Sequence, residues 1–218
     1  MDERASQKAE PKHVMAVSIL GTSHPLECGR VSHGRLPWGS TIMTSDFVQF
    51  DKGQPFYEMV GTFMVALSSF HAIFNADNPM KLEKSQYISM NGVRVPDKHL
   101  LPFEVFEQAQ AGHITMPTIL GNCCMMLANT AYESIKDRND QSPEFEFFRH
   151  VRNASSHRNR FYFTEKEPSR LAAWRGAVLD HMQRGSANPL QGAVCFGPIL
   201  GPADLIDLLA DIEKKFTP

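Results

Sequence analysis

Three segments repeat apolar residues at helical spacing, and this periodicity restricts the fold more than any other feature of the sequence. Residues 55–76 have apolar side chains three and four positions apart, and Pro55 suits a first helical turn. Residues 117–138 are apolar on most sides, which predicts a central, buried helix. A final amphipathic helix is predicted after Gly201 and Pro202, with an apolar stripe at Leu205, Leu208, Leu209, Ile212 and Phe216.

Shorter elements are predicted between these helices. The pair Asn91-Gly92 is a strong signal for a tight hairpin, which predicts a β-hairpin insertion at about residues 85–96. A short helix is predicted over residues 102–111, ending at Gly112. With the longer helices, the expected fold is mainly α, a bundle of four to five helices with a small β addition.

A further helix is predicted to begin at Ser142 and Pro143, since serine is a good N-cap and proline fits the first turn. This helix should carry the arginines and histidines described below. Residues 169–183 follow a break, and Trp174 is expected to be an interior anchor of that segment.

Length and composition suit one domain with an elaborated N-terminal part, since the 218 residues are 42% hydrophobic. Residues 1–12 are expected to be a flexible tail, residues 13–54 an irregular extension with short β pieces, and residues 55–218 the helical domain. The apolar run 14–20 is too short to cross a membrane, and no other segment is expected to be long enough to span one. These features predict a soluble, cytoplasmic protein.

The cysteines do not suggest a disulfide framework. Cys123 and Cys124 are adjacent in an apolar helical stretch, which fits buried free thiols in a reducing compartment. His24, Cys28 and His33 have no strong zinc-site spacing and lack a fourth ligand. No metal or cofactor is therefore expected.

The segment 149–164 holds four arginines and two histidines and no acid, in a chain whose formal net charge is -2. A cationic segment in a slightly acidic chain indicates a local anion site. At about 100° per residue, one helical face would carry a polar group consisting of Arg149, Arg152, Asn153, Ser156, His157 and Arg160.

Arg152 and His157 are five residues apart and diverge by about 140° on an ideal helix. Both can act on one phosphate if the helix ends near His157, or if two copies of the segment combine across a two-fold axis. The simpler alternative is a solvated basic face whose arginines pair with acids such as Glu144 or Asp180.

The order Arg152-Asn153-x-x-x-His157 resembles the R-polar-x-x-x-H signature of the HEPN superfamily, named for higher eukaryotes and prokaryotes nucleotide-binding. The resemblance covers roughly residues 115–216 and, more weakly, residues 55–76. Other segments also resemble bacterial members: Phe147-Phe148-Arg149, Phe161, Ala173-Trp174-Arg175-Gly176 and the closing helix.

The resemblance implies a HEPN-like helical bundle, often a homodimer with a shared groove, and a metal-independent endoribonuclease of bacterial defence or toxin–antitoxin systems. It implies that Arg152 neutralises the scissile phosphate and that His157 is the general acid or base. Asn153 would orient the histidine or the phosphate. Cleavage would proceed by attack of the 2′-hydroxyl, giving a 2′,3′-cyclic phosphate. From the helix geometry alone, Arg149, Arg160 and Ser156 would be supporting phosphate contacts.

Three functions are therefore compared. The leading one is the HEPN-type ribonuclease, with RNA, a second copy and an antitoxin or other defence protein as expected partners. The second is a non-catalytic HEPN-like module that binds RNA or nucleotides or recognises a partner. The third is a helical domain with a purely structural basic face.

Overall fold

The computed structural model describes residues 48, 50–74, 82–168, 170–179 and 187–216. The expectations for residues 1–12, for nearly all of the extension before residue 50 and for the His24, Cys28 and His33 group lie outside these ranges. Within them the fold is mainly α, as predicted, and the α-helices are α1 (Tyr57–Phe74), α2 (Pro102–Gln110), α3 (Met116–Ile135), α4 (Pro143–Ser156) and α5 (Pro202–Glu213).

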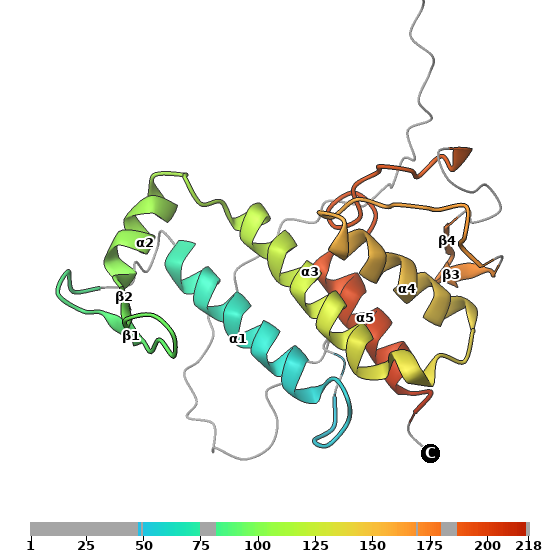
Figure 1. The fold of residues 1–218 in the computed structure, drawn as a ribbon, viewed down its shortest axis with the longest axis horizontal. Helices are drawn as coiled ribbons and strands as arrows, with labels where there is room; N and C mark the ends of the chain where they lie inside the picture. The colour runs from blue at the N-terminus through green and yellow to red at the C-terminus, as the bar shows by residue number, and fades with distance from the viewer. Residues whose placement is uncertain (1–47, 49, 75–81, 169, 180–186, 217–218) are drawn as a thin grey trace, which may run out of the picture. The chain divides into compact units, whose positions relative to one another are not determined.

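Helix α3 is the central element of the described bundle, because it packs against α1, α4 and α5 (Figure 1). A short 3₁₀ helix, Lys136–Arg138, continues it. One face of α3 is buried through Cys124, Leu127, Ala128, Ala131 and Ile135. The prediction of a buried helix is wrong at Met126, which lines an open groove beside α1 and is 69% exposed.

The core is built mainly from aromatic and branched side chains of α4 and α5. Helix α4 contributes three phenylalanines and α5 contributes its predicted leucine and isoleucine stripe. The largest fully buried apolar side chains are Phe56, Phe145, Phe147, Phe148, Phe161, Ile135, Leu179, Leu205, Leu208, Leu209 and Ile212. Burial of this many apolar side chains supplies the main free energy of folding.

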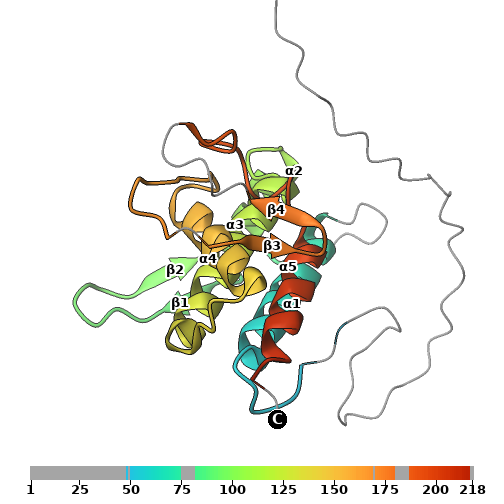
Figure 2. The ribbon, with the colours of Figure 1, turned by 90° about the vertical axis from the view of Figure 1, so that its right-hand side faces the viewer.

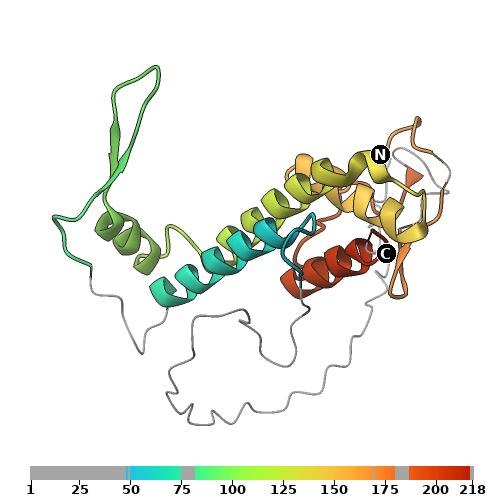
Figure 3. The same ribbon diagram turned by 90° about the horizontal axis from the view of Figure 1, so that it is seen from below.

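The predicted hairpin is present, but the loop between its strands is longer than the expected tight turn. Strands β1 (Ile88–Met90) and β2 (Lys98–Leu100) pair antiparallel, with Ser89 opposite His99 (Figure 3). The loop between them includes Val93 and Val95, which the tight-turn prediction placed in the second strand. Pro96 cannot donate a strand hydrogen bond, and the Gly92 N–H bonds the Asp97 carboxylate at 2.9 Å instead.

A second hairpin, which the sequence did not predict, consists of β3 (Ala172–Trp174) and β4 (Ala177–Leu179), and its strand β3 packs against α4 (Figure 2). Its turn is formed by Arg175 and Gly176, both with positive φ. Trp174 is buried, as predicted, and its indole N–H donates to Asp211 Oδ2 of α5 at 3.1 Å. The indole therefore ties the hairpin to the last helix.

Helix α1 is long and apolar enough, with a mean hydropathy of 1.2, to pass a composition test for membrane crossing. The expectation that no segment is long enough was wrong in this respect. The core helices of soluble proteins pass the same test but are mostly buried, whereas only 11% of this window is buried, through Val60 and Phe63.

Candidate functional site

Helix α4 positions the predicted site residues. Ser142 caps it by accepting a hydrogen bond from the Phe145 N–H at 3.4 Å, and Pro143 stands in its first turn, as predicted. The apolar residues of α4 are buried, whereas Arg152 and Asn153 are half-buried and Ser156 is exposed. The last turn of α4 therefore presents polar side chains at the surface.

Helix α4 ends within the cationic segment 149–164. Its last residue is Ser156, His157 is the C-cap, and Arg158 and Asn159 follow with φ of 59° and 64°. Two consecutive left-handed residues cannot continue a right-handed helix. Of the two ways by which Arg152 and His157 could act together, the structure thus has the first, a helix that ends at His157.

The guanidinium of Arg152 lies against helix α3. Its Nη2 donates to Glu133 Oε1 at 2.5 Å and its Nη1 donates to Asn153 Oδ1 at 3.3 Å. Its central carbon stands 5.6 Å from the centroid of the Tyr132 ring, a cation–π distance. Arg152 is thus held at the surface by one carboxylate, one amide and one aromatic face.

Ser156 and His157 follow at the end of α4. Ser156 Oγ donates to Asn129 Oδ1 of α3 at 2.7 Å. His157 is exposed, and its ring stands against that of Tyr162 with 4.8 Å between centroids and 33° between planes. The facing sides of α3 and α4 therefore carry a cation, two amides and a hydroxyl, whereas the His157 imidazole packs on the Tyr162 ring.

Arg149 does not belong to this group, contrary to the helical-face prediction. Its Nε donates to Glu146 Oε2 at 2.8 Å and its Nη1 to Glu167 Oε2 at 2.6 Å, so two carboxylates occupy the guanidinium. The physical reason is burial, since a half-buried arginine requires partners for its donors. Arg149 is therefore a structural residue in this conformation.

Arg160 is also displaced from the predicted face, because the helix has ended four residues earlier. Its backbone pairs with Val194 in a β-bridge, and its Nη1 donates to the Gly192 carbonyl at 2.8 Å. Arg160 thus holds the segment 187–200 near the end of α4. It does not belong to the polar cluster, by which we mean Arg152, Asn153, Ser156 and His157.

Sequence reasoning missed two residues that shape the site. Glu133 binds Arg152, and nothing local to either residue signals a pairing 19 positions apart. Asn159 fixes the chain after His157, because its side chain accepts from the Phe196 N–H at 2.7 Å and donates to the Phe196 carbonyl at 2.9 Å. An asparagine at this position could have indicated the end of the helix, since asparagine adopts positive φ more readily than most residues.

Burial controls the chemistry of the thiols. It raises the pKa of both Cys124 and Cys195 to about 12, so both stay protonated and inert at neutral pH. Cys123 and these two thiols are free, as predicted for the described cysteines. The described ranges contain no group of three or more His, Cys, Asp or Glu side chains arranged to hold a metal ion.

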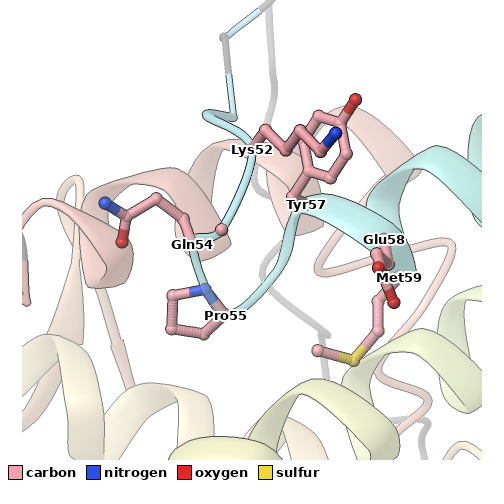
Figure 4. Close-up of a pocket in the computed structure, with 7 residues that line it drawn as sticks. Lys52, Gln54, Pro55, Tyr57, Glu58 and Met59 are labelled. Atoms are coloured by element: carbon pink, nitrogen blue, oxygen red, sulfur yellow. The ribbon is translucent and has the colours of Figure 1, made fainter.

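Two hollows lie away from the polar cluster. One of about 360 Å³ precedes α1 and is lined by residues 52–55 and 57–59, with Lys52, Tyr57 and Glu58 at its edge (Figure 4). The other is an apolar groove of about 320 Å³ between α1 and α3. Neither contains a predicted site residue.

Comparisons of the chain with protein-family models, with curated proteins and with solved structures found no match. The function is therefore inferred from the residues and their geometry.

Proposed function

We propose that the protein is a metal-independent endoribonuclease of HEPN type that cleaves RNA by attack of the 2′-hydroxyl. The observation that carries the proposal is the position of Arg152, Asn153 and His157 at the end of α4, where Arg152 and Asn153 are half-buried and His157 is exposed. Ser156 lies on the same turn as a further polar contact. A role in bacterial defence or in a toxin–antitoxin system, with a second copy and an antitoxin as partners, belongs to the same proposal.

The chemistry required of the cluster is modest. The 2′-hydroxyl is an internal nucleophile, so the reactants are already adjacent. An imidazole exchanges protons near neutral pH, and His157 would serve as general acid or base. The guanidinium of Arg152 matches two phosphate oxygens and stays charged, so it would stabilise charge that develops on the phosphate.

The site is proposed to be completed by a second copy through the apolar groove between α1 and α3. Met59, Phe63 and Ala66 of α1 face Cys123, Met126 and Leu127 of α3 there. On α3, Met126, Thr130 and Glu133 follow one another at helical spacing, so the groove is continuous with the carboxylate that binds Arg152. An isologous contact at this groove would bring two polar clusters together.

Replacing Met126 with aspartate should dissociate this dimer. A charge placed in an apolar contact must lose its hydration on association, which costs far more than the methionine contact contributes. Size-exclusion chromatography with light scattering is expected to show a wild-type dimer and a Met126→Asp monomer with lost cleavage. The exposed Val65→Asp change is the control for charge alone, and a wild-type monomer at micromolar concentration would contradict the proposed interface.

A second candidate function is a non-catalytic partner-recognition module, which the first hairpin favours. All six residues of β1 and β2 are exposed, and large apolar side chains gather on and between them: Tyr87, Ile88, Met90, Val93, Val95 and Leu100. Exposed apolar side chains in one place are typical of interaction surfaces.

Incubation of the purified protein with total cellular RNA in EDTA separates the two candidates. The nuclease proposal predicts discrete fragments without added metal. Intact RNA in EDTA, with or without later addition of Mg²⁺, would favour the recognition module. Cleavage that begins only when Mg²⁺ is added would contradict a metal-independent mechanism.

A further inference from the structure

Glu133 binds the guanidinium of Arg152, the group to which the proposed function assigns the binding of the RNA phosphate. Its Oε1 lies 2.5 Å from Arg152 Nη2, and its Oε2 lies 2.8 Å from Lys136 Nζ. One carboxylate thus bridges the site arginine of α4 and a lysine of the 3₁₀ helix that follows α3. An anion that approaches Arg152 meets this carboxylate first.

The other donors of Arg152 leave little room for a second partner in the same conformation. Nη1 is directed at Asn153 Oδ1, and one face of the guanidinium covers the Tyr132 ring. Nε is buried without a hydrogen-bond partner in the described part of the chain. A donor left unpaired in this way is costly, so the guanidinium is not held in its best possible arrangement.

The ion pair between Glu133 and Arg152 is weak enough to open when another anion binds Arg152. The side chains of Arg152 and Glu133 are 32% and 44% exposed, and ion pairs at such exposure contribute little net free energy. The hydrogen bonds of Lys136 and then Arg152 hold the pKa of Glu133 below its ordinary value, so it remains an anion at neutral pH. Lys136 also gives the carboxylate a partner after it leaves Arg152.

We propose that Glu133 and an RNA phosphate are alternative partners of Arg152, so that Glu133 is an electrostatic gate of the site. Entry of the backbone releases Glu133 to Lys136 and frees the Arg152 guanidinium, including its Nε, to bind phosphate oxygens. This inference rests on the proposed function for the location of the phosphate, and it adds a residue on α3 that sets RNA affinity without touching the reacting atoms.

The test measures binding without cleavage. A 2′-O-methyl RNA oligonucleotide, which lacks the nucleophile, is titrated into full-length wild type and Glu133→Gln at constant salt. Removing the competing anion should lower the dissociation constant about two- to fivefold, the range that loss of one exposed ion pair permits. Glu144→Gln is the matched control, since it removes the same charge from another exposed pair, with Lys215 at 2.8 Å.

The Arg152→Gln background shows whether the effect acts through Arg152. There, Glu133→Gln should change the affinity no more than Glu144→Gln does, as a double-mutant cycle requires. In wild type, the NMR signal of the Arg152 Nε–H should shift as RNA is added. Thermal melts identify any variant that fails to fold, and the NMR experiment on wild type then decides alone.

Equal affinities of the two glutamate variants, weaker binding by Glu133→Gln, or no RNA binding by any form would overturn the gate. Tighter binding by Glu133→Gln together with absent cleavage of ordinary RNA would support the gate and contradict the nuclease. The two proposals therefore fail in different experiments.

Discussion

Replacing His157 with alanine should lower the rate of RNA cleavage by about 10²–10⁴-fold, the usual contribution of one general acid or base. His157 is the exposed C-cap of α4, and its ring contacts only the Tyr162 ring among the contacts described above. The change should therefore leave the thermal stability nearly unaltered. Single-turnover cleavage of a labelled RNA, in EDTA and across pH 5–9, is the measurement.

The control for this prediction is His113→Ala, which alters another exposed histidine, located between α2 and α3. It should cleave at the wild-type rate. If His157→Ala cleaves as fast as His113→Ala, the imidazole at the end of α4 has no role in the chemistry, and the assignment of the site is wrong.

Replacing Glu146 with alanine should lower the free energy of unfolding by about 3–5 kcal/mol, because it removes the buried carboxylate that pairs with two arginines and leaves Arg149 with Glu167 alone. The Glu146 side chain is 0% exposed and binds Arg149 at 2.8 Å and Arg170 at 3.0 Å. Denaturant unfolding of both proteins measures the difference. Glu144→Ala, which breaks an exposed pair with Lys215, should cost about 1 kcal/mol or less.

The same carboxylate predicts a dependence of stability on pH. Burial alone would raise the pKa of Glu146, but the hydrogen bonds from Arg149 and Arg170 outweigh burial and lower it. A carboxyl whose pKa is lowered by folding stabilises the protein above its ordinary pKa, and this stabilisation is lost as the pH falls. The stability difference between wild type and Glu146→Gln should therefore shrink below about pH 4. A constant difference from pH 7 to pH 3 would contradict the buried ion pair.

Sequence periodicity was sufficient for α1, α3 and α5, whose apolar residues recur at helical spacing, whereas α2 buries only Ala109 and was predicted between Pro102 and Gly112. The start of α4 was readable from Ser142 and Pro143, and that of α5 from Gly201 and Pro202. The β3–β4 hairpin was missed because its strands have three residues each, too few to display an alternating pattern. The first strand of the first hairpin lies within the predicted residues 85–96, but the second strand, Lys98–Leu100, lies beyond them, and Asn91-Gly92 did not define the turn.

The site was predictable only in part. The residues Arg152, Asn153 and Ser156 lie at the end of α4 and His157 caps it, which is a local property. The partners of Arg149 and Arg152 are not local, since Glu167 and Glu133 lie 18 and 19 positions away. Only the packing of α3 and of the segment after α4 decides which arginine is enclosed and which stays at the surface. The pairing of Glu146 with Arg149 was readable, because residues three apart on a helix are neighbours.

The chemistry of the cleaved ends tests the central claim most directly. Wild-type protein is incubated in EDTA with an RNA oligonucleotide taken from a mapped cleavage site, beside the same oligonucleotide with a single 2′-O-methyl group at that position. The account predicts a 2′,3′-cyclic phosphate and a 5′-hydroxyl from the first and no cleavage at that position of the second. Products with a 3′-hydroxyl and a 5′-phosphate, or equal cleavage of both oligonucleotides, would contradict it.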